Sequence, residues 1–503
     1  MTNQNWSQSL KIEHDVARII TDQAHHGVNF DKQRAKWCIF DLTEKILNID
    51  LKAIPQMPLM MCTGNTFNKP FLKNGQLTSH VIAYCEEHGT PEFRSQISGP
   101  FSRVWFEQFD MGKTGLVKEY LVSHGWIPDE WNWKDRDLSK LDEYMSGLLS
   151  SPYLNSALIA LDFKGQRRVD RLRDHLTNER KWPTSPKITE SSFETISGTI
   201  PQLVKDRVVW SHRRSLIQGL LDNLRPDGRL SAEANPCATP TGRMRHKTVV
   251  NIPAAGKSQY GHQCRSLFIG DWDNDLCKHW PMVGYDGSGL ELRMLSHYIN
   301  DDGFTNSIIN GNSKDGTDIH SCNQRAAGLP TRDHAKTFIY AFIYGAGDAK
   351  LGSIIGGTSE DGSTLRTNFL TNYPLLGNLI TRIQAEAVKG YLIGLDGRKL
   401  ILRRDAKGKV MVHKALNTLL QGAGAIVMKY AMVLLDDWVT EAGLRAHKVL
   451  DVHDEGQWTC HPEDVPKLRE FMESCVTAAG ELLQMNVPLR SDSKYGRNWS
   501  YTH

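Results

Sequence analysis

Several features that mark particular classes of protein are missing from this sequence of 503 residues. Its nine cysteines are scattered and form no Cys-x-x-Cys pair, which argues against a structural zinc site and fits a reducing compartment. The polar beginning, MTNQNWSQSL, lacks the apolar core of a secretion signal. The longest nearly apolar run, 422–435, is interrupted by Lys429 and is too short to span a bilayer. We therefore expect a cytoplasmic protein with no membrane partner.

Neither the charge nor the composition selects a substrate. The net charge is +3 and the pI about 8.3, and 40% of the residues are hydrophobic. A charge this small neither demands nor excludes a nucleic acid, because a local basic groove is enough to bind one. The length leaves room for two or more domains, or for one large multi-lobed domain.

The first half of the chain combines helices with irregular segments. Apolar residues at helical spacing predict two helices within 8–48 and further helices at 110–127 and 202–221. The segment 52–100 is rich in Pro, Gly, Asn and Thr, which is typical either of an inserted, partly extended module or of a long surface loop. A basic run at 167–173 is either a solvated helix face or a DNA contact.

One stretch of the second half carries distinctive side chains at every fourth position. Arg332, Lys336, Tyr340 and Tyr344 fall on one face of a helix, and apolar residues occupy the opposite face. Cations suit phosphates, and aromatic rings suit a base or a sugar. The stretch is therefore either a grip for a nucleoside triphosphate or an ordinary amphipathic helix with two solvated charges.

Two carboxylates at strand ends decide between these alternatives. Asp286 ends an apolar strand and Asp454 lies at the tip of an apolar hairpin, although either one alone is as well explained as a cap or a turn residue. Brought together, they would repel each other unless Mg²⁺ lay between them. Two such ions are the usual clamp for an in-line attack on phosphorus. The sequence therefore predicts phosphoryl transfer, with metals on Asp286, Asp454 and the carbonyl of Gly287, and positive charge from Arg332 and Lys336.

Three motifs in this order resemble those of family A DNA polymerases, the bacterial DNA polymerase I family. DGSGLELR at 286–293 resembles their motif A, the helix at 332–345 resembles motif B, and VHDE at 452–455 resembles motif C. PTGR at 240–243 and the ending GRNW at 496–499 resemble the replicative polymerases of short-tailed lytic phages. The resemblance implies an α+β right-hand fold, with an antiparallel palm sheet and helical fingers and thumb. It also implies DNA-templated addition of deoxynucleotides to a primer.

The resemblance further implies roles for individual residues. Nucleotide binding is implied for His320, Arg332, Lys336, Tyr340, Tyr344 and Glu291. Contacts with the primer–template are implied for Arg243, Gln421, His453 and Gly347. Catalysis is implied for Asp286, Asp454, Lys336, Arg332 and the supporting carboxylate Glu455, with two Mg²⁺ ions that Mn²⁺ can replace. Within these sets, Glu291 is the gate against a 2′-hydroxyl, and the hydroxyl of Tyr340 predicts ready use of dideoxynucleotides.

In such a fold the chain divides into four parts. They are an N-terminal helical region and thumb at 1–224, with an insertion at about 52–100, a first part of the palm at 225–298, fingers at 299–413 and a second part of the palm at 414–503. Gly287 stands where close relatives have alanine, and we expect little effect because only its carbonyl is needed.

The N-terminal residues hold no Asp-x-Glu strand motif of the 3′–5′ exonuclease that relatives carry, so we expect no intrinsic proofreading. A separate exonuclease subunit or a processivity factor, bound through about 52–100, is the partner hypothesis. A phage-encoded enzyme would work in the cytoplasm of its host. The alternatives are a single-subunit RNA polymerase and a catalytically silent DNA-binding replication factor.

Overall fold

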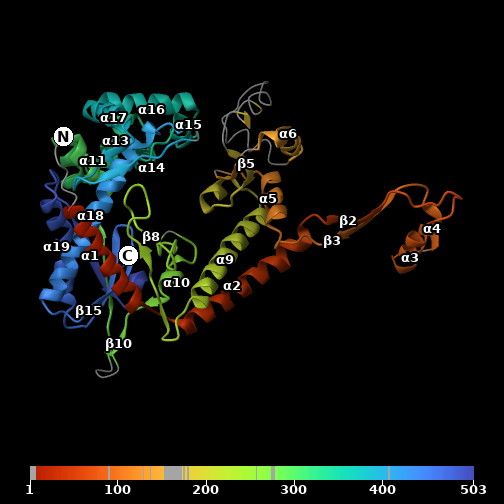
Figure 1. Ribbon diagram of the computed structural model, residues 1–503, viewed down its shortest axis with the longest axis horizontal. Coiled ribbons are helices and arrows are strands. Elements are labelled where there is room, and N and C mark those ends of the chain that lie inside the picture. Colours follow the sequence, from red (N-terminus) through yellow and green to blue (C-terminus); the bar gives the residue numbers. More distant parts are fainter. Residues whose placement is uncertain are drawn as a thin grey trace. The chain divides into compact units, whose positions relative to one another are not determined.

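The computed structural model describes residues 7–88, 91–128, 130–135, 137–151, 173, 176–177, 181–256, 258–273, 278–405 and 408–502. The chain forms two compact units, labelled by element in Figure 1. Unit 1 combines residues 1–41 with 212–503, and unit 2 is 42–211. Residues 1–41 therefore cluster with unit 1, whereas the predicted region 1–224 grouped them with 42–211. The palm, fingers and thumb boundaries stay predictions.

Unit 1 has helices around a small antiparallel sheet. Its helices are α1 (Ser7–His26), α10 (Gly261–Arg265), α11 (Leu290–Ile299), α12 (Asp302–Ile309), α13 (Ile319–Ala327), α14 (Arg332–Ile343), α15 (Asp348–Ser353), α16 (Ser359–Asn372), α17 (Pro374–Ala387), α18 (Ala415–Glu441) and α19 (Val465–Leu482). Its longer strands are β1 (Val28–Phe30), β12 (Met282–Gly287), β13 (Tyr391–Ile393), β14 (Lys399–Ile401), β15 (Ala446–Val452), β16 (Glu455–Cys460) and β17 (Ser491–Gly496). Two-residue strands are β6 (Arg229–Leu230), β7 (Ala234–Asn235), β8 (Arg245–His246), β9 (Phe268–Ile269), β10 (Trp272–Asp273) and β11 (Lys278–His279). Helices α2 (Lys32–Ala53) and α9 (Thr199–Asp222) have residues in both units.

The central sheet of unit 1 has the strand order β15-β16-β12-β17 and is antiparallel throughout. The two middle strands, β16 and β12, pack closely because a glycine on each strand lies opposite a large side chain on the other. Gly284 is opposite Gln457, and Tyr285 is opposite Gly456. A Cβ on Gly284 would lie 2.2 Å from Gln457 Nε2, and one on Gly456 would lie 2.4 Å from the Tyr285 ring. Any side chain at either glycine would therefore disturb the register of this ladder.

Helix α18 is the core helix of unit 1 and is buried on nearly every side. It contains the apolar run 422–435 that we judged too short to span a bilayer. With the turn before it, the helix is long and apolar enough by length and composition to cross a membrane, but 83% of its most apolar window is buried inside the protein. This pattern is that of the central helix of a large core, because a helix that is apolar all round is buried by its neighbours.

The predicted helix with distinctive side chains is confirmed as α14. Its N-terminus is capped by Thr331, whose side-chain oxygen accepts a hydrogen bond from the His334 N–H at 3.2 Å. Five apolar side chains are buried, and they are Ala335, Phe338, Ile339, Phe342 and Ile343. Tyr344 is the residue that ends the helix. The opposite face is therefore left for Arg332, Lys336 and Tyr340, as the spacing predicts.

Unit 2 has its own apolar core, formed by α5 (Thr114–Ser123) with the parts of α2 and α9 that belong to it. Its remaining elements are η1 (Ile54–Gln56), β2 (Met60–Phe67), α3 (Ser79–His88), α4 (Pro91–Gln96), β3 (Phe101–Glu107), β4 (Trp131–Asp135), η2 (Leu138–Lys140), α6 (Leu141–Leu149), β5 (Lys181–Pro186) and η3 (Glu190–Thr195). The basic run 167–173 lies outside the described residues except for Arg173, which pairs with Asp142 at 2.6 Å.

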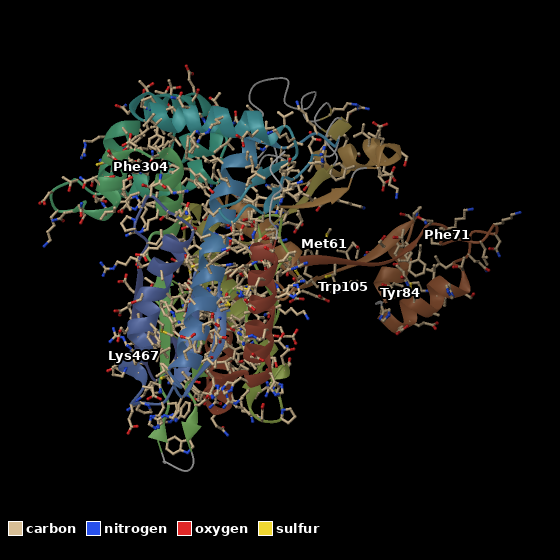
Figure 2. All side chains as sticks on the ribbon, turned by 60° about the vertical axis from the view of Figure 1, so that its left-hand side comes forward. Met61, Phe71, Tyr84, Trp105, Phe304 and Lys467 are labelled. Carbon is tan, nitrogen blue, oxygen red and sulfur yellow. The ribbon has the colours of Figure 1, made fainter. Side chains whose placement is uncertain are left out.

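The segment 52–100 is a partly extended module and not a long loop. Strands β2 and β3 pair as a two-stranded ribbon, and α3 and α4 lie between them in sequence. Figure 2 shows Met61 on this ribbon and Tyr84 at its far end. There, the rings of Phe67 and Phe101 stack with centroids 4.9 Å apart, and Tyr84 lies 4.9 Å from Phe67. This aromatic cluster holds α3 against the ribbon.

Candidate active site

Strand register brings Asp286 and Asp454 to the same end of the sheet. Asp286 pairs with Glu455 in the β12–β16 ladder. One step further, the Gly287 N–H donates a hydrogen bond to the Asp454 carbonyl at 3.1 Å. The tight turn from β15 into β16 needs a positive φ, which His453 adopts at 60°. The two aspartates therefore occupy successive steps of one ladder, at the same end of the sheet.

The electrostatics of Asp454 fit a cation site. Burial, followed by the nearby carboxylates of Glu291 and Glu455, raises the pKa of Asp454. A hard divalent cation would reverse this effect, because it stabilises the charged carboxylate. The two aspartates and the carbonyl of Gly287 are oxygen donors of the kind that Mg²⁺ prefers. Among the described residues, no group of three or more His, Cys, Asp or Glu side chains is arranged to hold a metal ion.

Glu455 is anchored in the core. Its side chain is 3% exposed and accepts hydrogen bonds from Trp499 Nε1 and from Gln457 Nε2, the latter at 2.6 Å. Arg265 lies 3.7 Å from it and is itself buried. The carboxylate therefore fixes the start of β16 next to Asp454, which fits the predicted supporting role. A signal for one of these partners was present in the sequence, because Trp499 lies in the ending GRNW that resembles phage polymerases.

Arg332 has a partner that sequence reasoning missed. Its guanidinium donates to both carboxylate oxygens of Asp318, with the shortest contact at 2.8 Å. Burial opposes ionisation of Asp318, but hydrogen bonds from Arg332 and Ser321 lower its pKa to about 2. Asp318 also caps α13 by accepting from the His320 N–H at 3.2 Å. Asp318 therefore orients the first cation of α14 and begins the helix that carries His320.

The tyrosines of the site gather around Glu291. The Tyr344 hydroxyl donates to Glu291 Oε1 at 3.3 Å, and Arg243 Nη2 lies 3.6 Å from the same oxygen. Burial, then the charges of Glu291, Tyr344 and Asp454, raises the pKa of Tyr340 to about 12. Both phenols therefore stay protonated at neutral pH, next to the predicted gate residue.

Comparison with known proteins points to one family. Residues 169–501 match the family described as DNA polymerase family A. The chain belongs to this family. It is 40% identical to the DNA-directed DNA polymerase of Escherichia phage Phieco32, over 98% of both chains. It is 28% identical to that of Enterobacteria phage T3, over 99% of this chain and 71% of that one.

A solved structure agrees with this family A assignment. The POL domain of Pol1 from M. smegmatis, in complex with DNA primer-template and dNTP, has a TM-score of 0.66 and 18% identity, covering 97% of this chain and 70% of that one. The predicted polymerase fold is thereby confirmed, and the family confirms the predicted activity of a DNA-directed DNA polymerase. DNA polymerases of family A generally use divalent metal ions.

The polymerase does not bring all predicted site residues into one place. Arg243 and His453 line one cavity together with Asp454. Gly347 lines another cavity, beside Phe342 and Arg366. Gln421 lies on α18 and is half-buried, whereas Lys336 is exposed on α14 and His320 is half-buried on α13. Burial, then nearby Arg332 and Lys336, lowers the pKa of His320, so this histidine lies among the cations of the site.

Proposed function

We propose that this family A polymerase extends a DNA primer with deoxynucleotides by a two-metal mechanism. Asp286, Asp454 and the carbonyl of Gly287 hold two Mg²⁺ ions, which Mn²⁺ can replace. When bound, these ions lower the pKa of the primer 3′-hydroxyl and neutralise the triphosphate. The observation that carries this proposal is the adjacent ladder position of the two aspartates, beside a raised pKa at Asp454.

The remaining side chains bind and orient the reactants. Arg332, Lys336 and His320 bind the triphosphate, and Lys336 donates a proton to the leaving pyrophosphate. Tyr340 packs on the sugar and Tyr344 shapes the base-pair pocket. Glu291, fixed by Tyr344 and Arg243, excludes a 2′-hydroxyl. Glu455 supports the metal ligands, and Arg243, Gln421, His453 and Gly347 contact the primer–template.

Primer extension by the purified chain tests this proposal. Asp454→Asn should slow extension roughly a thousandfold, because metal-ion stabilisation of the transition state is worth several kcal/mol. Asp492→Asn is the matched control, since Asp492 pairs with Asp286 on the other side of β12 but is exposed and bonded to Ser288. Unchanged extension by Asp454→Asn would refute the two-metal account. Faster primer extension with ribonucleotides than with deoxynucleotides would favour an RNA polymerase. No extension by the folded protein without substitutions would favour a silent DNA-binding factor.

We further propose that proofreading comes from a separate exonuclease subunit. The support is the sequence, in which the N-terminal residues hold no Asp-x-Glu strand motif. A primer with a mismatched 3′ end should therefore persist when the pure enzyme is incubated with Mg²⁺ and no nucleotides. Excision of the mismatch by the pure chain would contradict this. Encoded by a phage, as its relatives are, the enzyme would work in the host cytoplasm.

The insertion at about 52–100 is the proposed contact for that exonuclease or for a processivity factor. Met61 pairs with Phe106 across the β2–β3 ribbon, and both side chains are 63% exposed. Val104 and Leu59 add further exposed apolar surface, at 48% and 63%. Deleting residues 55–98 should shorten products made in host extract but not those made by the pure enzyme. Equal product lengths in the extract would count against a partner at this module.

A further inference from the structure

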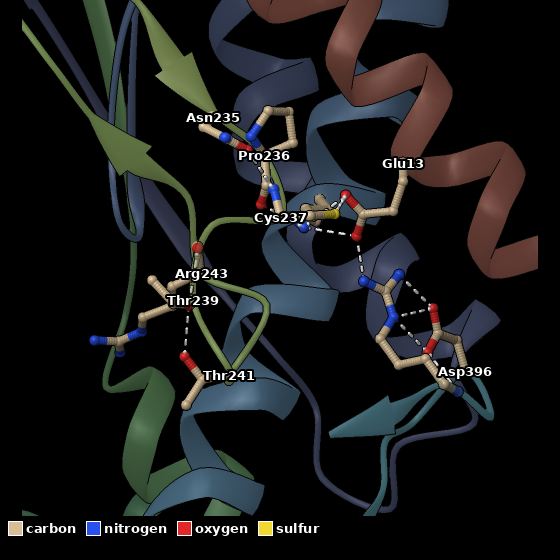
Figure 3. A network of polar contacts seen from close by, with 10 residues as sticks. Glu13, Asn235, Pro236, Cys237, Thr239, Thr241, Arg243 and Asp396 are labelled. Atoms are coloured by element: carbon tan, nitrogen blue, oxygen red, sulfur yellow. Dashed lines mark hydrogen bonds and ion pairs between the residues drawn. The ribbon is translucent and has the colours of Figure 1, made fainter. Parts of the chain in front are cut away.

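Four charged side chains form a buried cluster in unit 1, drawn in Figure 3. Glu13 comes from α1, Lys429 from α18, and Asp396 and Arg398 from the hairpin β13–β14. Their side chains are 14%, 2%, 1% and 10% exposed, in that order. Two cations balance two anions, which is the condition under which buried charges are tolerated.

Glu13 joins the two cations. Lys429 Nζ donates to both of its carboxylate oxygens, at 2.6 and 2.8 Å, and Arg398 donates to Oε1. Arg398 also grips Asp396 through three hydrogen bonds of 2.6 to 2.9 Å. Burial would raise the pKa of Glu13, but Lys429, Cys237 and Arg398 outweigh it, so the pKa of Glu13 lies below its usual value. Glu13 is therefore a charged acceptor at neutral pH.

The same cluster holds the segment that leads to Arg243. The Cys237 thiol donates to Glu13 Oε2 at 2.9 Å, and Lys429 Nζ donates to the Pro236 carbonyl at 3.1 Å. The chain then turns, and the Thr239 hydroxyl donates to the Arg243 carbonyl at 2.9 Å. The covalent chain from Cys237 to Thr239 connects these bonds, so Glu13 is linked to the backbone of Arg243.

Arg398 also lies under this turn. Gly242 has a φ of +74°, and a Cβ built on it would lie 3.9 Å from Arg398 Nη1. In Figure 3 the guanidinium of Arg243 points away from Glu13. Arg243 Nη2 lies 3.6 Å from Glu291 Oε1, and Arg243 lines a cavity together with Asp454, His453 and Lys429 of the cluster. The cluster therefore lies against the turn that carries Arg243, while the side chain of Arg243 reaches toward Glu291.

We propose that Glu13 is a positioning residue for Arg243, holding it in place to contact the primer–template. The inference rests on the proposed role of Arg243. Glu13 does not touch the site, and it acts through Cys237 and through the Lys429–Pro236 bond. A neutral side chain at position 13 would leave Lys429 and Arg398 buried with Asp396 as the single counter-charge within the cluster. Both cations would then shift, and the turn that rests on them would lose its fixed position.

The test is a double-mutant cycle on primer–template affinity, measured by fluorescence anisotropy, with primer-extension kinetics beside it. Glu13→Gln should weaken primer–template binding about tenfold and raise the KM for DNA, with the KM for deoxynucleotides unchanged. In an Arg243→Ala background the same substitution should cause no further loss. Arg18→Gln is the control, because Arg18 also joins α1 to α18, through Asp436 at 2.7 Å, without touching the cluster. It should bind DNA like the parent enzyme.

The outcomes separate the two proposals. If Arg243→Ala leaves affinity unchanged, the primer–template role of Arg243 fails, and the positioning role fails with it. If Arg243→Ala weakens binding but Glu13→Gln does not, or if the two losses add, the positioning role alone is overturned. Should Glu13→Gln fail to fold, Cys237→Ala removes one hydrogen bond at an exposed residue. Cys237→Ala should weaken primer–template binding about threefold in the parent background and should have no effect in the Arg243→Ala background. If Cys237→Ala binds primer–template as tightly as the parent enzyme, the proposal is overturned.

Discussion

Replacing Asp318 with asparagine removes the charge that orients Arg332, and the structure allows the effect to be sized. The pKa of Asp318 falls from 3.8 to about 2, which corresponds to at most roughly 2.5 kcal/mol of interaction. The Arg332 side chain is 41% exposed, so solvent screening reduces this to about 1 kcal/mol. In Asp318→Asn, the nucleotide itself must order Arg332. The KM of this variant for deoxynucleotides should therefore be about fivefold higher than that of the parent.

Two assays test this value of about 1 kcal/mol. Steady-state primer extension should show the rise in KM with a smaller change in kcat, because the interaction is lost in the bound ground state as well. Urea unfolding should show a loss of about 1 kcal/mol near neutral pH. The pKa of Asp318 is lower in the folded protein than in the unfolded chain. Its contribution is therefore complete above about pH 4 and is lost as the pH falls toward 2, so the parent and Asp318→Asn should converge in acid.

Asp315→Asn provides the matched control, because Asp315 lies nearby in the chain but bonds only to the exposed Asn312 among the described contacts. It should behave like the parent in both assays. The reasoning is refuted if Arg332→Ala raises the KM for deoxynucleotides while Asp318→Asn leaves it unchanged. That result would mean that Arg332 needs no prior orientation by a carboxylate.

Three further substitutions test individual roles. Tyr340→Phe should lose the use of dideoxynucleotides by at least about tenfold, since the tyrosine hydroxyl would fill the place of the absent 3′-hydroxyl; equal chain termination in sequencing-type reactions would refute this. Glu291→Ala should gain ribonucleotide incorporation in single-nucleotide extension, and no gain would remove its gate role. Gly287→Ala should keep near-parental extension, because a Cβ there meets neighbours at 3.5 Å or more; a large loss would show that more than its carbonyl matters.

The local structure around the motifs followed from the sequence because it depends on short-range patterns. Apolar runs locate β12 and the β15–β16 hairpin, a four-residue spacing locates α14, and the structure confirms each of them. The sequence puts Asp286 and Asp454 at strand ends, and the strand register brings both to the same end of the sheet, while the metal site between them stays a prediction. The roles assigned to individual residues at the site stay predictions.

The partners of buried charges did not follow from the sequence. Asp318 is separated from Arg332 by a helix and a loop, and Glu13 lies far from Lys429 and Arg398 in the chain. No periodicity links such residues, since only the folded backbone brings them together.

The division of the chain has a consequence for its synthesis. Unit 2 is one continuous stretch, so every residue of its core has left the ribosome once residue 211 has emerged. Helix α1 and strand β1 are made first but must wait, because β1 pairs with β6 and β9 and Glu13 needs Lys429. The N-terminal helix therefore spends most of translation without its partners. Its apolar face and its unpaired acid are exposed to solvent and to chaperones until the last hundred residues or so arrive.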